Sequence, residues 1–135
     1  MLRILLALLA AALLPAATSA QAKSRTGGAD ALLQQWDPDH DGTLDLAEVK
    51  KAAEAKFDTL DRDHDGTLDR SELRGIVSAK GIRDADPDKD KTLDKNEYLA
   101  LAEKRFKAAD KDNDGTLDKK ELNSPAGRAL RRLLQ

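Results

Sequence analysis

The 135-residue chain contains no cysteine. Disulfides, zinc–thiolate sites and thiol catalysis are therefore excluded. Only two histidines, His40 and His64, are present, which argues against a metal site built from several imidazoles. Aromatic residues are equally scarce, with four in the whole chain. A surface that stacks single-stranded nucleic acid needs aromatic residues interleaved with basic ones, so the composition argues against nucleic-acid binding.

The chain also lacks an apolar run long enough for a membrane span. One positive charge at Arg3 precedes an apolar stretch over residues 4–14, and small residues follow at 16–20. A span needs about 20 apolar residues, so this pattern is typical of a secretion signal that is removed. We expect cleavage after Ala20, with Ala22 as the alternative, export to the periplasm, and no stable membrane insertion afterwards. An uncleaved anchor is the competing interpretation.

Residues that form hydrophobic cores are few in the remaining chain. Leu, Ile, Val and Phe make up about 18% of residues 21–135, a level close to that of disordered proteins. Residues 21–29, which include Gly27 and Gly28, are predicted to be a flexible leader. Residues 30–135 are predicted to form one domain, in which another interaction must complement apolar burial.

One pattern of acidic residues occurs four times. The repeats, loops 1 to 4, are residues 37–48, 61–72, 86–97 and 110–121, and their first residues are 24, 25 and 24 positions apart. Such a period indicates an array of one supersecondary unit. Each loop has acids at positions 1, 3, 5, 9 and 12, and all but loop 3 have glycine at position 6. This is the pattern of the calcium-type EF-hand loop.

The spacing has a coordination-chemical reason. A hard cation takes about six to eight oxygens at roughly 2.3–2.6 Å. Carboxylates at positions 1, 3 and 5 converge on it, position 7 offers its backbone carbonyl, position 9 binds directly or through water, and Glu at position 12 gives two oxygens. The leucine at position 8 is expected in the core. The candidate ligands are Asp37, Asp39, Asp41, Thr43, Asp45 and Glu48 in loop 1; Asp61, Asp63, Asp65, Thr67, Asp69 and Glu72 in loop 2; Asp86, Asp88, Asp90, Thr92, Asp94 and Glu97 in loop 3; and Asp110, Asp112, Asp114, Thr116, Asp118 and Glu121 in loop 4.

The net charge is only −2, but acidic and basic residues are distributed unevenly along the chain. The loops hold 20 of the 25 acids and eight basic residues, whereas the rest of residues 21–135 has a net charge of +9. Five carboxylates in one loop repel one another, and a trivalent ion relieves more of that repulsion than a divalent one. Charge counting therefore favours a trivalent ion without identifying it. Lys91 replaces glycine at position 6 of loop 3, which predicts that loop 3 is the weakest site.

The segments between the loops predict helices. Apolar residues recur at helical spacing over 46–60 and 98–109. A short helix capped by Asp30 is expected before loop 1, and two short helical pieces that meet near Ser78 are expected between loops 2 and 3. Ser124 and a proline at the next position predict the start of a last helix.

The lengths of these helices predict how the loops pair. A helix over 46–60 spans about 22 Å at 1.5 Å per residue, which places loops 1 and 2 at opposite ends. The equally short connection between loops 3 and 4 has the same effect. We therefore predict an all-α, compact helical bundle with four EF-hand loops, in which loop 2 pairs with loop 3 and loop 1 with loop 4.

The combination of features resembles the lanmodulins, periplasmic lanthanide-binding EF-hand proteins of methylotrophic bacteria. The resemblance rests on the 12- or 13-residue connections, Asp at position 9 of every loop, proline at position 2 of loops 1 and 3, and the segments at 73–75, 97–100 and 121–127. It implies selective binding of up to four lanthanide(III) ions, with calcium as a weaker competitor, and a disorder-to-compact transition on binding. It also implies a role in lanthanide uptake or trafficking that serves lanthanide-dependent alcohol oxidation.

The chain departs from that family at a few positions. Arg62 and Lys111 stand where the best-known pattern has proline, and Lys91 stands for glycine, which affects the selectivity margin and the ranking of sites. Asp110 begins loop 4 with a full carboxylate where some relatives have asparagine, so tighter binding is expected there.

Other functions remain open from the sequence. A periplasmic calcium buffer or sensor would use the same loops. A docking protein that exposes an apolar groove is disfavoured because methionine-rich grooves are usual there, and Met1 is the only methionine. An enzyme is least favoured because each acid is already a candidate ligand. A metal-dependent dimer or a periplasmic protein partner stays open.

Overall fold

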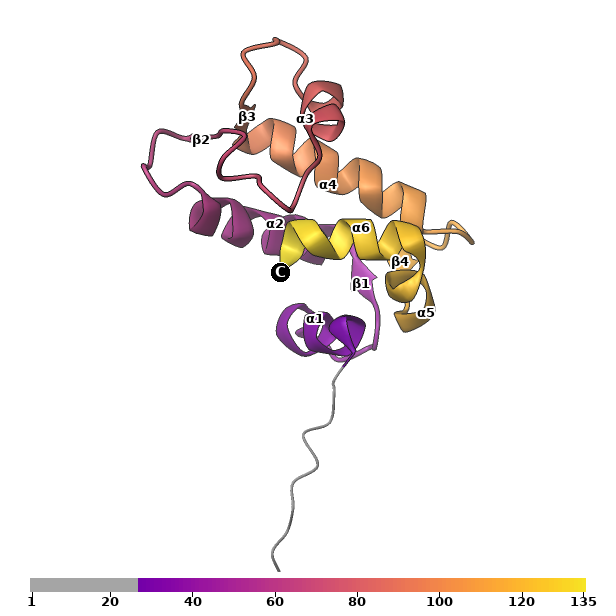
Figure 1. Cartoon of the computed structure of the whole chain (residues 1–135). Coiled ribbons are helices and arrows are strands. Elements are labelled where there is room, and N and C mark those ends of the chain that lie inside the picture. Colours follow the sequence, from indigo (N-terminus) through magenta and orange to yellow (C-terminus); the bar gives the residue numbers. More distant parts are fainter. Residues whose placement is uncertain (1–26) are drawn as a thin grey trace, which may run out of the picture.

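The computed structural model describes residues 27–135 (Figure 1). The predicted signal peptide and residues 21–26 of the predicted leader lie outside the described residues. The helices are α1 (Gly28–Trp36), α2 (Leu46–Leu60), α3 (Ala79–Ala85), α4 (Lys95–Ala109), α5 (Lys119–Asn123) and α6 (Pro125–Leu134). The strands are β1 (Leu44–Asp45), β2 (Thr67–Leu68), β3 (Leu93–Asp94) and β4 (Thr116–Leu117). No helix within residues 27–135 has the length and apolarity of a membrane span.

The helices that leave the loops begin with residues of the loops themselves. In α2, the Asp45 side chain accepts from the Glu48 N–H at 2.8 Å, and the Glu48 side chain accepts from the Asp45 N–H at 2.9 Å. The same reciprocal capping box starts α4 and α5. Such a box satisfies two otherwise unpaired backbone donors. Positions 9 and 12 of these loops therefore fix the direction in which each following helix starts.

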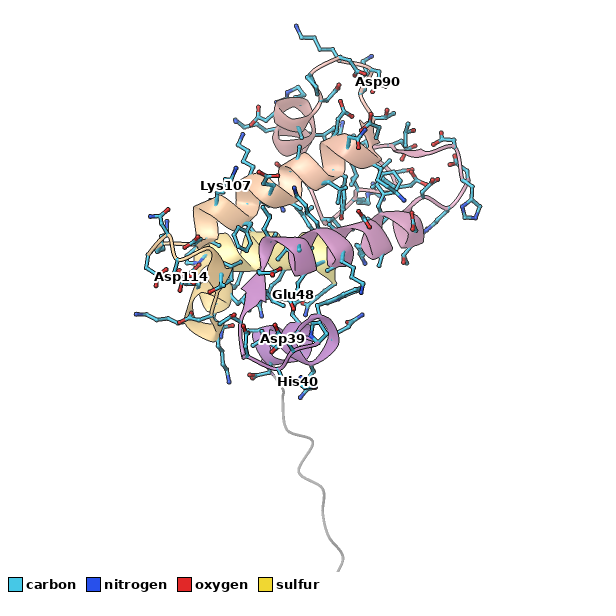
Figure 2. All side chains as sticks on the ribbon, turned by 180° about the vertical axis from the view of Figure 1, so that it is seen from behind. Asp39, His40, Glu48, Asp90, Lys107 and Asp114 are labelled. Carbon is cyan, nitrogen blue, oxygen red and sulfur yellow. The ribbon has the colours of Figure 1, made fainter. Side chains whose placement is uncertain are left out.

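The loops pair as their spacing predicts. β1 is antiparallel to β4, with Leu44 opposite Leu117, and β2 is antiparallel to β3, with Leu68 opposite Leu93. Loop 1 therefore lies beside loop 4, and loop 2 beside loop 3. All four position-8 leucines are fully buried, as predicted. Because α2 and α4 each run between the two pairs, the pairs occupy opposite ends of the molecule, and Asp90 of loop 3 lies far from Asp39 of loop 1 (Figure 2).

The core lies where α2, α4 and α6 pack against one another (Figure 1). Phe57 of α2 and Tyr98 of α4 form an edge-to-face pair with ring centroids 5.8 Å apart. The α6 leucines Leu130, Leu133 and Leu134 are buried, as the sequence predicts. The Ser124 side chain caps α6, which confirms the predicted Ser–Pro start.

Two details of the predicted helices are wrong. Asp30 is not the cap of the first helix, because α1 begins at Gly28 and Gly27 occupies the cap position without a side-chain hydrogen bond. Asp30 lies in the first turn and pairs with Lys119 at 2.6 Å. The first helical piece predicted after loop 2 is a series of turns over residues 70–76. Its helix fails because Gly75 takes a left-handed φ of +82°, and only the piece capped by Ser78 forms a helix, α3.

Candidate metal centres

Each loop is first organised by its position-1 aspartate. Its Oδ2 atom accepts a hydrogen bond from the backbone N–H of position 6, at 2.9, 3.1, 2.9 and 3.1 Å in loops 1 to 4. The residue is also where the preceding helix ends: Asp37 closes α1, Asp61 closes α2, Asp86 closes α3 and Asp110 closes α4. The end of each helix is thereby tied to the turn of the loop that follows it.

The turn depends on two residues with left-handed backbone. Position 4 takes a φ between +57° and +61° in all four loops, at His40, His64, Lys89 and Asn113. Position 6 takes +83° or +86° at the three glycines and +73° at Lys91. A non-glycine residue in this region costs roughly 1 kcal/mol. Lys91 therefore adopts the left-handed backbone conformation that was expected to weaken metal binding in loop 3. His40 and His64 are exposed on the outside of their loops.

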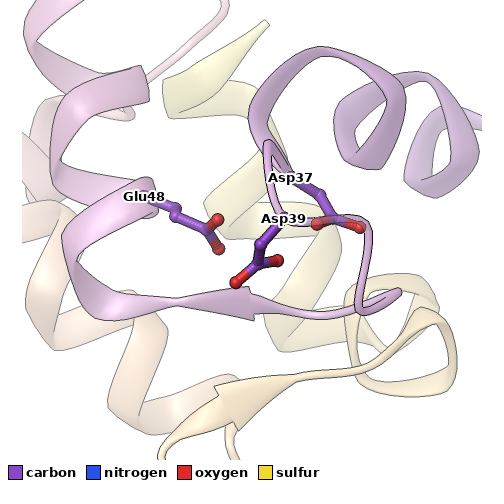
Figure 3. A group of neighbouring side chains, drawn as sticks. All are labelled: Asp37, Asp39 and Glu48. Carbon is purple, nitrogen blue, oxygen red and sulfur yellow. The ribbon is translucent and has the colours of Figure 1, made fainter.

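Carboxylates from both ends of each loop converge. Ligand oxygens of positions 1, 3 and 12 all lie within 4.8 Å of one another in every loop. Figure 3 shows this for Asp37, Asp39 and Glu48, whose carboxylates point toward a common centre. The glutamate comes from the first turn of α2, whereas the aspartates come from the loop. A cation at this centre would bridge the end of one helix to the start of the next.

A buried carboxylate oxygen in three of the loops has no hydrogen-bond partner. These oxygens are the Oδ1 atoms of Asp61, Asp86 and Asp110. Asp61 and Asp86 are only 7% and 6% exposed. Burying an unpaired charged oxygen is costly, and the remaining carboxylates nearby add repulsion rather than relief. A cation held at the same centre satisfies these oxygens, so the donor set fits a hard metal ion.

The remaining predicted ligands have other contacts. The position-5 aspartates accept hydrogen bonds from the N–H and hydroxyl of the position-7 threonine, at 2.7–2.8 Å in all four loops. The position-9 aspartates cap the following helix turn by accepting from the position-12 N–H at 2.7–2.9 Å. These bonds leave one oxygen of each carboxylate available. The assignment of positions 5, 7 and 9 as ligands stays a prediction.

The crowding of carboxylates affects their protonation. Burial raises the pKa of Glu48 and of Glu97; the backbone N–H of position 9 opposes this effect, and the neighbouring aspartates add to it. The hydrogen bond shared with Asp37 raises the pKa of Asp39. Glu48 and Glu97 hold protons more readily than free glutamates chiefly because burial disfavours the charged form, and Asp39 does so because it shares a hydrogen bond with Asp37. A cation reverses that preference.

One feature of the loops was missed by sequence reasoning. The backbone N–H of position 2 reaches the position-12 glutamate in loops 2 and 4, from Arg62 to Glu72 and from Lys111 to Glu121. The signal was present in the sequence as proline at position 2 of the other two loops, but it was read only as part of a family pattern.

Comparison with known proteins agrees with this geometry. The model of the EF-hand family matches residues 55–77 and 101–124, which contain loops 2 and 4. A comparison with curated proteins found no significant match. The helical fold, the four carboxylate clusters and the matched segments together describe a mostly helical domain with four acidic loops of EF-hand type, paired 1 with 4 and 2 with 3.

Proposed function

We propose that this protein selectively binds trivalent lanthanide ions, up to four per chain, in the periplasm, and that it folds as it binds them. This activity serves lanthanide uptake or trafficking. The observation that carries the proposal is the unpaired, buried Oδ1 of the position-1 aspartate inside a cluster of acidic side chains. Calcium is expected to compete weakly for the same centres.

The charge of the loops supports a trivalent ion. Each loop has five carboxylates, and loop 1 contains no lysine or arginine to offset them. A divalent ion leaves three of the five negative charges of that loop uncompensated, and a trivalent ion leaves two. At an effective dielectric constant of about 20, two unit charges 4 Å apart interact with roughly 4 kcal/mol. The one additional positive charge of a trivalent ion therefore adds an attraction of this kind to each carboxylate close to the centre.

The link between binding and folding follows from which residues are shared. In loops 1, 3 and 4, the position-1 aspartate ends one helix, and the position-9 and position-12 acids start the next. An ion at the centre draws these groups together and removes the repulsion that separates them. The free energy of binding then contributes to the stability of a chain that has few core residues.

A titration followed by far-UV circular dichroism tests the proposal. Residues 21–135 are titrated with lanthanum and separately with calcium in chelator-buffered solutions. A helical transition at sub-nanomolar free lanthanum, with calcium needing a concentration higher by many orders of magnitude, supports lanthanide selectivity. Equal responses to both ions at micromolar concentrations would replace it with the second candidate, a periplasmic calcium buffer or sensor. That candidate is favoured by the calcium-type spacing of the loops.

The remaining parts of the proposal concern context. We propose that residues 1–20 direct export and are removed, that residues 30–135 form the metal-binding domain, and that the protein is not a catalyst. The acids that a hydrolytic mechanism would require are the same ones that converge in the four clusters. Size-exclusion chromatography with and without lanthanum distinguishes a monomer from a metal-dependent dimer, and a metal-loaded pull-down from periplasmic extract tests for a protein partner.

A further inference from the structure

The backbone N–H of position 2 divides the loops into two kinds. In loop 2, the Arg62 N–H donates to Oε1 of Glu72 at 3.0 Å, and in loop 4, the Lys111 N–H donates to Oε1 of Glu121 at 2.8 Å. The other oxygen of each glutamate accepts from the position-9 N–H, at 3.1 and 3.2 Å. Both oxygens of the closing glutamate are thus held by the loop's own backbone, one at each end of the loop.

Loops 1 and 3 cannot form the first of these bonds. Their second residues are Pro38 and Pro87, and proline has no N–H. The closing glutamates Glu48 and Glu97 accept only from the position-9 N–H, at 2.9 and 2.8 Å. Within the described residues, their Oε1 atoms have no hydrogen bond to the first half of the loop. Within residues 27–135, no hydrogen bond joins these glutamates to positions 1 and 3, so a bound ion would have to make that connection.

The backbone at position 1 differs in the same way. φ is −106° at Asp37 and −107° at Asp86, before the prolines, but −68° at Asp61 and −67° at Asp110. ψ lies between 82° and 94° at all four residues. This ψ is outside the helical region that a following proline disfavours. The ψ of Asp61 and Asp110 therefore does not oppose a proline at the next position, so loops 2 and 4 can be tested with proline there.

The strand pairing joins one loop of each kind. β1–β4 links loop 1, which has proline, to loop 4, which has the donor, and β2–β3 links loop 3 to loop 2 in the same way. Each end of the molecule therefore has one loop whose glutamate accepts from both position 2 and position 9, and one whose glutamate accepts from position 9 alone.

We propose that the backbone N–H groups of Arg62 and Lys111 act as latches that hold the closing glutamates of loops 2 and 4 in position within the folded loop, whereas loops 1 and 3 depend on the ion for this second connection. The inference rests on the proposed ion binding of the loops. A glutamate side chain loses rotamer freedom when it is fixed in place. In a latched loop the hydrogen bond from position 2 offsets part of this loss, so ion binding has less of it to overcome. The latched loop of each pair is therefore expected to bind its ion at a lower concentration than the loop with proline at position 2.

Paired substitutions test the latch. Arg62→Pro and Arg62→Ala both remove the guanidinium, but only Arg62→Pro removes the N–H; Lys111→Pro and Lys111→Ala form the same pair in loop 4. Pro38→Ala supplies the missing N–H in loop 1. The position-6 amides, which bond to the position-1 aspartates, report each loop separately in ¹H–¹⁵N spectra: Gly42, Gly66, Lys91 and Gly115.

Titrations with lanthanum, and in parallel with calcium, then give the half-saturation of each loop. Loop 2 of Arg62→Pro is expected to need at least about fivefold more ion than loop 2 of Arg62→Ala, the scale of one ordinary hydrogen bond lost. Pro38→Ala is expected to fill loop 1 at lower concentration.

Equal half-saturation of Arg62→Pro and Arg62→Ala would overturn the latch. A lower half-saturation concentration for Arg62→Pro than for Arg62→Ala would also overturn it, because that result is expected if proline acts only by stiffening the loop. The lanthanide proposal fails separately, when lanthanum and calcium bind wild type equally well. The comparison of the two Arg62 variants still decides the latch in that case, because it is made within each ion.

Discussion

The hydroxyl of Tyr98 donates a hydrogen bond to the backbone carbonyl of Leu133 at 2.8 Å. Tyr98 directly follows Glu97, the closing glutamate of loop 3, and Leu133 lies near the end of the chain. Burial raises the pKa of Tyr98, so the hydroxyl remains a donor over the whole physiological range. The first turn of α4, which supplies a candidate ligand, is thus fixed to the last helix of the core.

Tyr98→Phe removes this bond and keeps the ring. We expect the ion-loaded protein to lose about 1–2 kcal/mol of unfolding free energy, because a buried carbonyl loses its donor. Urea unfolding at saturating lanthanum measures the loss. Thr59→Ala, which removes an exposed hydroxyl bonded to the Ala55 carbonyl, is the control and should change stability far less. Equal effects in the two variants would mean that the buried bond contributes nothing specific.

The unpaired Oδ1 atoms of the position-1 aspartates predict a strong charge effect. Asp61→Asn keeps the shape of the side chain and leaves an oxygen for the Gly66 N–H, but removes the negative charge at the centre. Lanthanum affinity of loop 2 is expected to fall about tenfold or more. Glu54→Gln removes one charge from the exposed face of α2 and serves as the matched control. Loop-resolved titration compares the two, and an equal response would show that only net charge matters.

Loop 3 should improve when glycine is restored. Lys91 takes a φ of +73°, which glycine adopts freely. Lys91→Gly removes roughly 1 kcal/mol of backbone strain and a positive charge beside the centre, so loop 3 is expected to bind lanthanum about fivefold more tightly. Gly66→Lys makes the reverse change in loop 2 and should weaken it. An unchanged loop 3 in Lys91→Gly would remove the reason for ranking it last.

Acid should release the ions before ordinary glutamates titrate. The pKa of Glu48 and of Glu97 lies above the usual value of 4.5 in the protein without ion. A raised acid pKa means that protons bind the folded loop more tightly than the unfolded chain. Protons therefore compete with the ion for these glutamates as the pH falls through the raised pKa, and protonation favours the ion-free loop. Ion binding requires the deprotonated form, and affinity therefore falls over the same range.

Apparent lanthanum affinity between pH 7 and pH 4 measures this competition. A decline that has begun above pH 4.5 is expected, and Glu48→Gln should remove the part that belongs to loop 1. An affinity that stays constant down to pH 4.5 would contradict the raised pKa values.

The pairing of the loops could be predicted because it follows from chain length alone. Twelve residues between loops 1 and 2 leave room for a single helix and none for a reversal, and α2 fills that segment without interruption. The clusters could be predicted because the turn geometry is set by local residues, above all the left-handed residues at positions 4 and 6.

Other details depend on contacts between distant segments. The start of α1 could not be read from Asp30, because Ala29 is buried and Asp30 pairs with Lys119 from the other end of the chain. The position-2 latch also escaped sequence reasoning, because the ligand pattern counts side-chain oxygens and overlooks the amide of a residue that is no ligand. The first of the two helical pieces predicted between loops 2 and 3 does not form, because Gly75 takes a left-handed backbone conformation there.

Competition between the two ions under equilibrium dialysis tests the central claim most directly. The ion-free protein is dialysed against 1 µM free lanthanum together with 1 mM free calcium, and the bound metals are counted by mass spectrometry. Lanthanum in most of the four loops, despite the large excess of calcium, is the expected result. Loops filled mainly by calcium would contradict selective lanthanide binding and leave a calcium-binding EF-hand protein.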